Sequence, residues 1–252
     1  MKQSIWIVLA RLLNRGARAI RRQPSPREPE EWRSVRFSFS HYAEDLLVLH
    51  LLRDKISRGE SGIYVDVGAF DPVRFSNTLL LHQHGWIGIN VDPNAAQIEK
   101  FRRCRPADAN LCAIVSDSER PVDYLEYPTG GTNRLVDPSE ARRENVNGEP
   151  PSSTVRMTTT TLADLLAEHL PPGAKIDFLN VDCEGEDLAA LRGLDWSRWS
   201  PEVIAIEAYD DDARAAVTDF VVARGYTPAA QCLLTLIFVR SAGRVSDLRA
   251  YA

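Results

Sequence analysis

Residues 62–71, Gly-Ile-Tyr-Val-Asp-Val-Gly-Ala-Phe-Asp, constrain the fold more than any other stretch. The apolar, β-branched run at its start is typical of a strand buried in a parallel sheet. The run stops at Gly68 and Ala69, which are small enough for a tight turn and for close approach of a ligand. Ser76 and Asn77 precede a run of leucines, where a helix N-cap is expected. Strand, glycine turn and helix predict the first unit of a doubly wound α/β fold, whose ligands bind at the carboxyl ends of the strands.

A second buried strand is predicted at residues 86–91, and Asp92 ends it. Asp92 lies 24 residues after Gly68, close to the spacing of about 20 at which such a fold holds a ribose hydroxyl with an acidic residue. The dinucleotide pattern Gly-x-Gly-x-x-Gly is absent, because the next glycine after Gly68 is Gly85. A single glycine together with Asp66 inside the strand favours S-adenosylmethionine as the ligand. Another nucleotide, or a turn without a ligand, are the alternatives.

Length and composition fit one α/β domain with a sizeable core. The chain has 252 residues, of which 44% are hydrophobic and 26% charged. Its formal net charge of −5 argues against nucleic acid as a partner of the whole molecule. The four cysteines form no Cys-x-x-Cys pattern, so we expect reduced thiols and a cytoplasmic protein rather than disulfides or a zinc site.

The N-terminal region differs in composition from the rest of the chain. Residues 1–27 contain no Asp or Glu, and on a helix four arginines share one face opposite a set of apolar side chains. The apolar run is shorter than the roughly 20 residues of a membrane span, and no signal-peptide cleavage site follows. Three interpretations stay open: a helix on the cytoplasmic membrane surface, a helix docked on a partner or a second copy of the chain, or a solvated tail. With the Pro-rich linker at 23–31, the predicted division is 1–34, helix and linker, and 35–252, the folded domain.

Later segments continue the α/β pattern. Strands are predicted at 109–115, 175–181 and 203–206, and a closing antiparallel hairpin at 226–228 and 233–239. Residues 118–155 are expected to form an inserted hairpin or flap near the mouth of a pocket. Ser116 and Asp117 follow the third strand, where a polar residue either receives the adenine amino group or belongs to a solvated loop.

Carboxylates follow several strands of the predicted sheet: Asp66 and Asp71, Asp182 and Glu184, and Glu207. They are expected to converge, because the carboxyl ends of parallel strands meet at one edge. Methyl transfer to a hydroxyl needs an in-line approach and a base for the hydroxyl proton. Asp182 is the first candidate for that base and Glu184 the second. An acid beside a glycine just before a helix is also what a plain helix N-terminus shows.

Two other groups of polar residues have weaker signals. Asp182, Glu207 and the aspartates at 210–212 offer oxygen ligands that suit Mg²⁺. A metal is not favoured, because an aspartate run is more often a solvated helix start. Glu44 and Asp45 either charge the first turn of a helix or reach over the pocket.

Several segments, in order and spacing, now resemble the FkbM family of S-adenosylmethionine-dependent methyltransferases over about residues 39–207. The matching segments are Ser-His-Tyr-Ala-Glu-Asp (40–45), Tyr-Val-Asp-Val-Gly-Ala (64–69), Ser-Asn-Thr (76–78), Gly-Trp-Ile-Gly (85–88), Asp-Pro-Asn (92–94), Thr-Leu-Ala-Asp-Leu-Leu (161–166) and Ile-Asp-Phe-Leu-Asn-Val-Asp-Cys-Glu-Gly (176–185). Asn180 stands where this family usually has Lys.

The resemblance implies a Rossmann-like, seven-stranded methyltransferase sheet, mostly parallel, with an antiparallel C-terminal hairpin and helices on both faces. It also implies O-methylation, often of a sugar hydroxyl. Carried over by position, it implies that Asp66, Gly68, Ala69 and Asn77 line the methionine part of the cofactor, Asp92 holds the ribose, Asp117 beside Ser116 meets the adenine, and Asp182 and Glu184 face the acceptor.

The sequence therefore predicts an S-adenosylmethionine-dependent O-methyltransferase with a carbohydrate acceptor, such as a glycan or a glycolipid handled at the cytoplasmic membrane face. Two alternatives stay open. One is methylation of a small acid or polyketide hydroxyl, and the other is a non-catalytic partner that keeps the fold as a docking platform.

Overall fold

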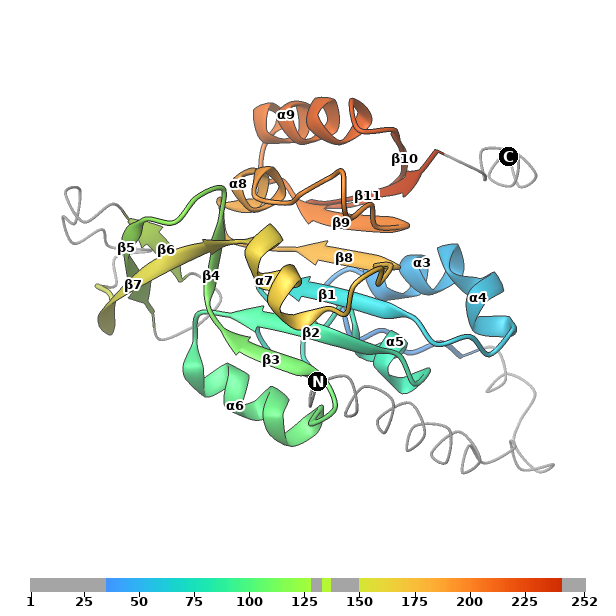
Figure 1. Cartoon of the computed structure of the whole chain (residues 1–252), viewed down its shortest axis with the longest axis horizontal. Helices are drawn as coiled ribbons and strands as arrows, with labels where there is room; N and C mark the ends of the chain where they lie inside the picture. Colours follow the sequence, from blue (N-terminus) through green and yellow to red (C-terminus); the bar gives the residue numbers. More distant parts are fainter. Residues whose placement is uncertain (1–34, 128–132, 137–149, 242–252) are drawn as a thin grey trace.

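The computed structural model describes residues 35–127, 133–136 and 150–241. The predicted N-terminal helix and linker lie outside the described residues, as does much of the predicted flap. The described part is a mixed α/β fold built on two sheets (Figure 1). Within the described ranges, none of the helices is long and apolar enough to cross a membrane.

The larger sheet has seven strands, whose order across the sheet differs from their order along the chain. The strands run β10 (Tyr226–Cys232), β11 (Thr235–Arg240), β9 (Val203–Glu207), β8 (Phe178–Val181), β1 (Ile63–Val67), β2 (Ile87–Asp92) and β3 (Ala109–Cys112). The five strands from β9 to β3 are parallel, while β11 pairs antiparallel with both β9 and β10. The predicted seven-stranded, mostly parallel sheet is confirmed. Chain order reverses direction at β1, which lies between β8 and β2.

The central strand β1 is buried along its whole length because apolar clusters cover both of its faces. Ile63, Val65 and Val67 belong to the cluster that includes side chains of three helices, α7 (Leu162–His169), α8 (Asp187–Arg192) and α9 (Asp211–Val222). Tyr64 belongs to the other cluster, with side chains of α3 (Glu44–Leu51) and α5 (Leu79–Gln83). The short helix α4 (Arg53–Ser57) follows α3, and α6 (Ala95–Cys104) connects β2 to β3.

The single third strand predicted at 109–115 is wrong, because the segment divides between two sheets. β3 joins the larger sheet, whereas β4 (Ile114–Ser116) pairs with β7 (Ser153–Thr161) in a second sheet of order β4-β7-β5-β6. The other strands of this sheet are β5 (Pro121–Glu126) and β6 (Arg134–Val136).

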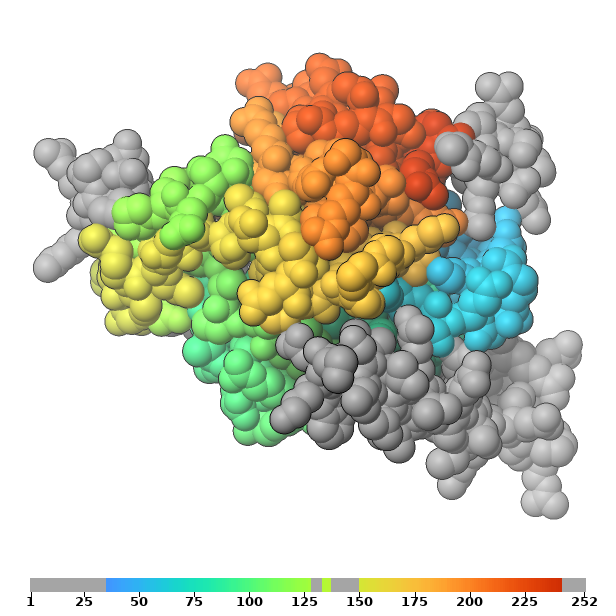
Figure 2. Space-filling view, in the orientation of Figure 1, coloured from blue at the N-terminus to red at the C-terminus, as the bar shows by residue number. Residues whose placement is uncertain are grey.

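The second sheet has a small core of its own. Ile114, Val122 and Tyr124 are buried there, with Leu135 and Met157 packed against them. Pairing of β4 with the long strand β7 draws the chain away from the end of β2, so the main sheet stops at Cys112. The second sheet extends from one end of the larger sheet (Figure 1), and Figure 2 shows green and yellow atoms of this part projecting on one side of the molecule.

Candidate functional site

A cavity of about 320 Å³ lies at the carboxyl ends of the central strands. This is within the range typical of small-molecule sites. Its wall comes from the ends of β1, β2, β8 and β9, from the loops before α3 and α5, and from β5 and β6 of the second sheet. Ligands of open α/β sheets bind at this edge, where the strand order reverses.

The turn after β1 requires glycine. Gly68 has a φ of 77°, and a Cβ built on it would lie 1.6 Å from the backbone oxygen of Asp182. The backbone N–H groups of Gly68 and Ala69 both donate to the Val91 carbonyl, at 2.9 and 3.0 Å. The predicted glycine turn therefore brings the ends of β1, β2 and β8 together, and both Gly68 and Ala69 line the cavity.

Asp66, Asn77 and Asn180 form a polar chain below this turn. Asp66 is buried and accepts hydrogen bonds from Thr78 Oγ1 at 2.7 Å and from Asn180 Nδ2 at 2.9 Å. The Asn77 amide donates to Asn180 Oδ1 at 2.9 Å. Burial raises the pKa of Asp66. Asn180 thus bridges Asp66 and Asn77 at a position where a lysine would introduce a charge.

One buried atom of these three residues has no hydrogen-bond partner in the described part of the protein. Asn77 lines the cavity, and its Oδ1 has no hydrogen-bond partner among the described residues. A buried acceptor without a partner is unfavourable unless a ligand supplies a donor. An ammonium group such as that of a methionine moiety would be such a donor.

Asp92 also lines the cavity, at the end of β2. Its carboxylate accepts hydrogen bonds from the backbone N–H groups of Asn94 at 2.8 Å and Phe70 at 2.9 Å. The side chain is 7% exposed, and burial raises its pKa to about 6. The carboxylate is therefore held rigidly at the position that the spacing from Gly68 predicts.

Sequence reasoning missed Gln97, which lies on α6 five residues after Asp92. It lines the same cavity, and its buried Oε1 has no hydrogen-bond partner within the described part of the chain. The available signal was a polar residue in the first turn of the helix that follows β2. Gln97 is a second candidate for contact with the nucleoside part of a ligand.

The structure does not bring Ser116 and Asp117 to the cavity. The Ser116 hydroxyl is buried and donates to Glu186 Oε2 at 3.0 Å, and Asp117 is exposed. The cavity is lined instead by the preceding residues, at 113–115. The predicted adenine contact stays a prediction that the lining of the cavity does not support, because the chain leaves the main sheet after Cys112 and enters the second sheet.

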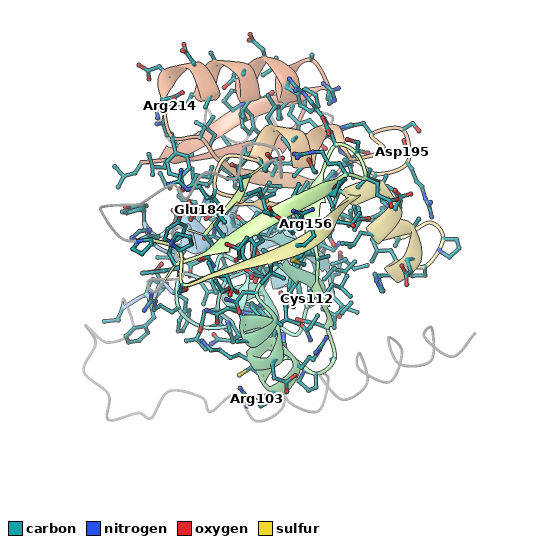
Figure 3. All side chains as sticks on the ribbon, turned by 90° about the vertical axis from the view of Figure 1, so that its left-hand side faces the viewer. Arg103, Cys112, Arg156, Glu184, Asp195 and Arg214 are labelled. Carbon is teal, nitrogen blue, oxygen red and sulfur yellow. The ribbon has the colours of Figure 1, made fainter. Side chains whose placement is uncertain are left out.

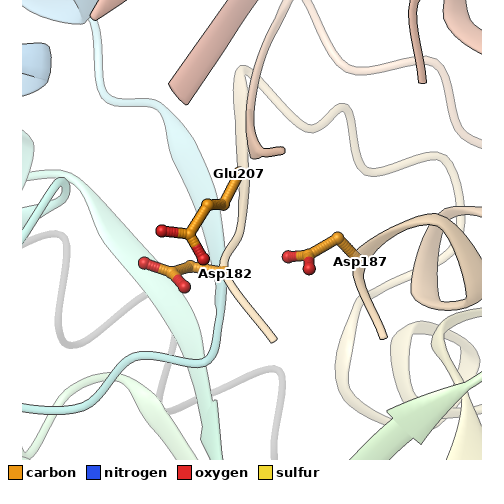
Figure 4. A group of neighbouring side chains, drawn as sticks. All are labelled: Asp182, Asp187 and Glu207. Atoms are coloured by element: carbon orange, nitrogen blue, oxygen red, sulfur yellow. The ribbon is translucent and has the colours of Figure 1, made fainter. Parts of the chain in front are cut away.

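Carboxylates from β8 and β9 do converge. Asp182, Glu184 and Glu207 all line the cavity. One carboxylate oxygen from each of Asp182, Asp187 and Glu207 lies within 4.8 Å of the other two. Figure 4 shows the three side chains. Burial, followed by the charge of Glu207, raises the pKa of Asp182 well above its ordinary value.

Asp187 was not predicted, and its role is local. Its two carboxylate oxygens accept hydrogen bonds from the backbone N–H groups of Cys183 at 2.7 Å and Gly185 at 3.0 Å. Burial raises the pKa of Asp187 to about 7. These bonds fix the turn that presents Asp182 and Glu184. Because both oxygens are already used, the three carboxylates are a poor set of ligands for Mg²⁺.

The aspartates at 210–212 do not join this group. Asp210 caps α9 by accepting the Ala213 backbone N–H at 2.7 Å, and Asp211 pairs with Arg214 at 2.6 Å. They are the start of a helix, which was the more ordinary interpretation of the run. Their position gives no support to an Mg²⁺ site that includes them.

Glu184 occupies a special backbone position. Its φ is 52°, and its carboxylate accepts a hydrogen bond from the Tyr209 hydroxyl at 2.5 Å. Glu184 is labelled in Figure 3, between β8 and α8. Burial raises its pKa, and the bond from Tyr209 opposes that rise.

The sequence left open whether Glu44 and Asp45 charge the first turn of α3 or reach over the pocket, and the two residues differ in this respect. Glu44 is buried, lines the cavity and accepts the Tyr42 backbone N–H at 2.7 Å. Asp45 holds the loop before α3, accepting hydrogen bonds from Ser38 Oγ at 2.6 Å and the Phe39 backbone N–H at 2.7 Å.

The fold and the cavity together define a class. A mostly parallel sheet with a glycine turn after β1, and an acidic residue at the end of β2 in the same cavity, is the arrangement at which Rossmann-like folds place a ligand. A family model for the methyltransferase FkbM domain matches residues 66–228, and the chain belongs to this family. The match contains Asp66, Gly68, Asp92 and both candidate bases. No curated protein and no solved structure matches the chain.

Proposed function

We propose that this methyltransferase is S-adenosylmethionine-dependent and methylates a hydroxyl, that of a sugar in a glycan or glycolipid. The observation that carries the proposal is the meeting of Gly68, Asp92 and Asp182 in one cavity. The sugar acceptor rests on the chain's membership of the FkbM family.

The charge of the cavity supports this cofactor over a dinucleotide. Seven carboxylate residues line it, against two arginines, Arg74 and Arg134. Such a lining attracts a cationic sulfonium and repels a pyrophosphate. S-adenosylmethionine carries the sulfonium, and it supplies an electrophilic methyl group when bound.

The residues present fit that cofactor. At position 68 a Cβ would collide with the backbone oxygen of Asp182, so only glycine keeps this turn of the cavity wall in place. The unpartnered Asn77 Oδ1 is an acceptor for the ammonium group, and Asp92 is an acceptor for ribose hydroxyls. Asp92 thereby gains hydrogen-bond donors that offset part of its burial.

Asp182 is proposed as the general base. Its raised pKa makes this carboxylate a stronger base than an ordinary aspartate, which suits it to accept a hydroxyl proton. Glu207 stands beside it in the same cavity. Glu184 is held by Tyr209 and is proposed to orient the acceptor hydroxyl.

The test combines calorimetry with turnover. S-adenosylhomocysteine is expected to bind wild type and Asp182→Asn with equal affinity, while only wild type methylates a sugar panel scored by mass spectrometry. No heat and no thermal shift with either cofactor form at millimolar concentration would remove the proposal. Cofactor binding without turnover on any acceptor class would instead support the non-catalytic docking platform.

A further inference from the structure

Four rings gather at the mouth of the cavity, from the loop before α3 and the loop after β1. We name His41, Tyr42, Phe70 and Phe75 the aromatic shelf; all four line the cavity. The rings of His41 and Tyr42 stack with centroids 4.1 Å apart, and His41 lies 4.5 Å from Phe75. Phe70 and Phe75 are 6.2 Å apart. His41 therefore links the two loops into one surface.

Core packing does not account for this surface. Tyr42 is 39% exposed and Phe75 is 44% exposed. Phe70 and Phe75 have φ values of 53° and 59°, a left-handed conformation that bulky side chains rarely adopt. Unfavourable backbone combined with exposed rings is found at ligand sites, where bound molecules supply the missing contact area.

Arg74 lies on the shelf. Its guanidinium carbon is 4.7 Å from the centre of the Phe75 ring and 5.4 Å from that of Phe70. Across residues 35–127, 133–136 and 150–241, no carboxylate forms a salt bridge with it, and Asp71 accepts only its backbone N–H. A guanidinium stacked on rings keeps its edge available for a carboxylate or phosphate.

We propose that the aromatic shelf and Arg74 form the acceptor subsite, and that the acceptor is a sugar carrying an anionic group. This inference rests on the proposed function. The rings take the apolar face of the sugar, and Arg74 takes its carboxylate or phosphate. Asp182, Glu184 and Glu207 repel the anionic group, which fixes the orientation and directs a hydroxyl toward Asp182.

The experiment measures binding, so it does not depend on turnover. Methyl glucoside, methyl glucuronide and methyl glucoside 6-phosphate are titrated by ligand-observed NMR into protein saturated with S-adenosylhomocysteine. The two anionic sugars are expected to bind about tenfold to a hundredfold more tightly than the neutral one. The stronger of the two distinguishes a carboxylate source from a phosphate source.

Variants assign the preference to residues. Arg74→Gln is expected to abolish it, Arg74→Lys to keep part of it, and Phe75→Leu to weaken all three sugars alike. The matched control is Arg103→Gln, an exposed arginine at the end of α6 that does not line the cavity (Figure 3). Thermal melts establish that each variant is folded.

Three results would overturn the inference: equal binding of the three sugars to wild type, no binding of any, or a preference that Arg74→Gln retains. A loss of S-adenosylhomocysteine affinity in Arg74→Gln equal to the loss for sugars would also overturn it, by assigning the guanidinium to the carboxylate of the cofactor. Failure of the proposed function is distinct, because it appears as no binding of S-adenosylhomocysteine to wild type, or as cofactor binding without turnover, and neither result depends on Arg74.

Discussion

Burial of Asp92 makes the stability of the protein depend on pH, and the substitution Asp92→Asn removes this contribution alone. The pKa of this carboxyl rises from 3.8 to about 6 because it is buried, despite two backbone N–H donors. A carboxyl with a raised pKa in the folded state contributes stability that is fully present below about pH 3.8. That contribution is lost as the pH rises through about 6.

The magnitude follows from the shift. A difference of about 2 pH units, at 1.36 kcal/mol per unit, corresponds to about 3 kcal/mol between the fully protonated and fully ionised carboxyl. Between pH 4 and pH 7 the expected change is about 2 kcal/mol, because the unfolded chain is already half ionised near pH 4. In Asp92→Asn this component is absent at every pH.

The assay is urea unfolding of wild type and Asp92→Asn, followed by circular dichroism at several pH values from 4 to 7. The free energy of unfolding of wild type relative to the variant is expected to fall by about 2 kcal/mol over this range. Any fixed effect of replacing one acceptor oxygen by an amide cancels, because only the change with pH is used. A difference independent of pH would refute the argument that burial raises this pKa.

Three further predictions concern the turn, the base and the support beneath them. Gly68→Ala is expected to destabilise the fold by roughly 2–5 kcal/mol, because the residue has a left-handed φ and its Cβ would clash with Asp182. The variant is also expected to lose S-adenosylhomocysteine binding, and calorimetric binding near wild-type affinity would contradict this. Asp182→Asn is expected to lower kcat about 10²-fold to 10⁴-fold. Because the pKa of Asp182 is raised, the wild-type rate should still increase with pH above the range in which an ordinary carboxyl ionises; a wild-type rate that does not change from pH 5 to 9 would count against Asp182 as the base. Arg105→Leu removes a buried cation that donates to Thr78 Oγ1 at 2.8 Å and Ser76 Oγ at 2.9 Å. The free energy of unfolding in urea should therefore fall by about 3–5 kcal/mol, and a decrease under 1 kcal/mol would show that these acceptors find other donors.

Local patterns predicted the parts of the site that lie on consecutive elements. The apolar run ending at Gly68 and the acid closing the next strand are separated by one helix, and a right-handed crossover places such strands side by side. Gly68, Asp66 and Asp92 therefore fell into one cavity as their spacing indicated. Asp182 joined them because strand ends of a parallel sheet share an edge.

Contacts distant in sequence decided the rest. Residues 109–115 have the pattern of one strand, yet β4 leaves the main sheet and pairs with β7, whose residues lie 45 positions further along the chain. Because of this pairing, Ser116 lies in the second sheet and does not line the cavity.

By itself, the sequence determined the strand, glycine turn and acid at the core of this protein, because those depend on short-range backbone geometry and on spacing along the chain. Only the tertiary structure decided that Gln97 lines the cavity and that the ring of His41 contacts that of Phe75. Sheet order and loop packing bring these side chains together, and neither is encoded in the period of a single segment.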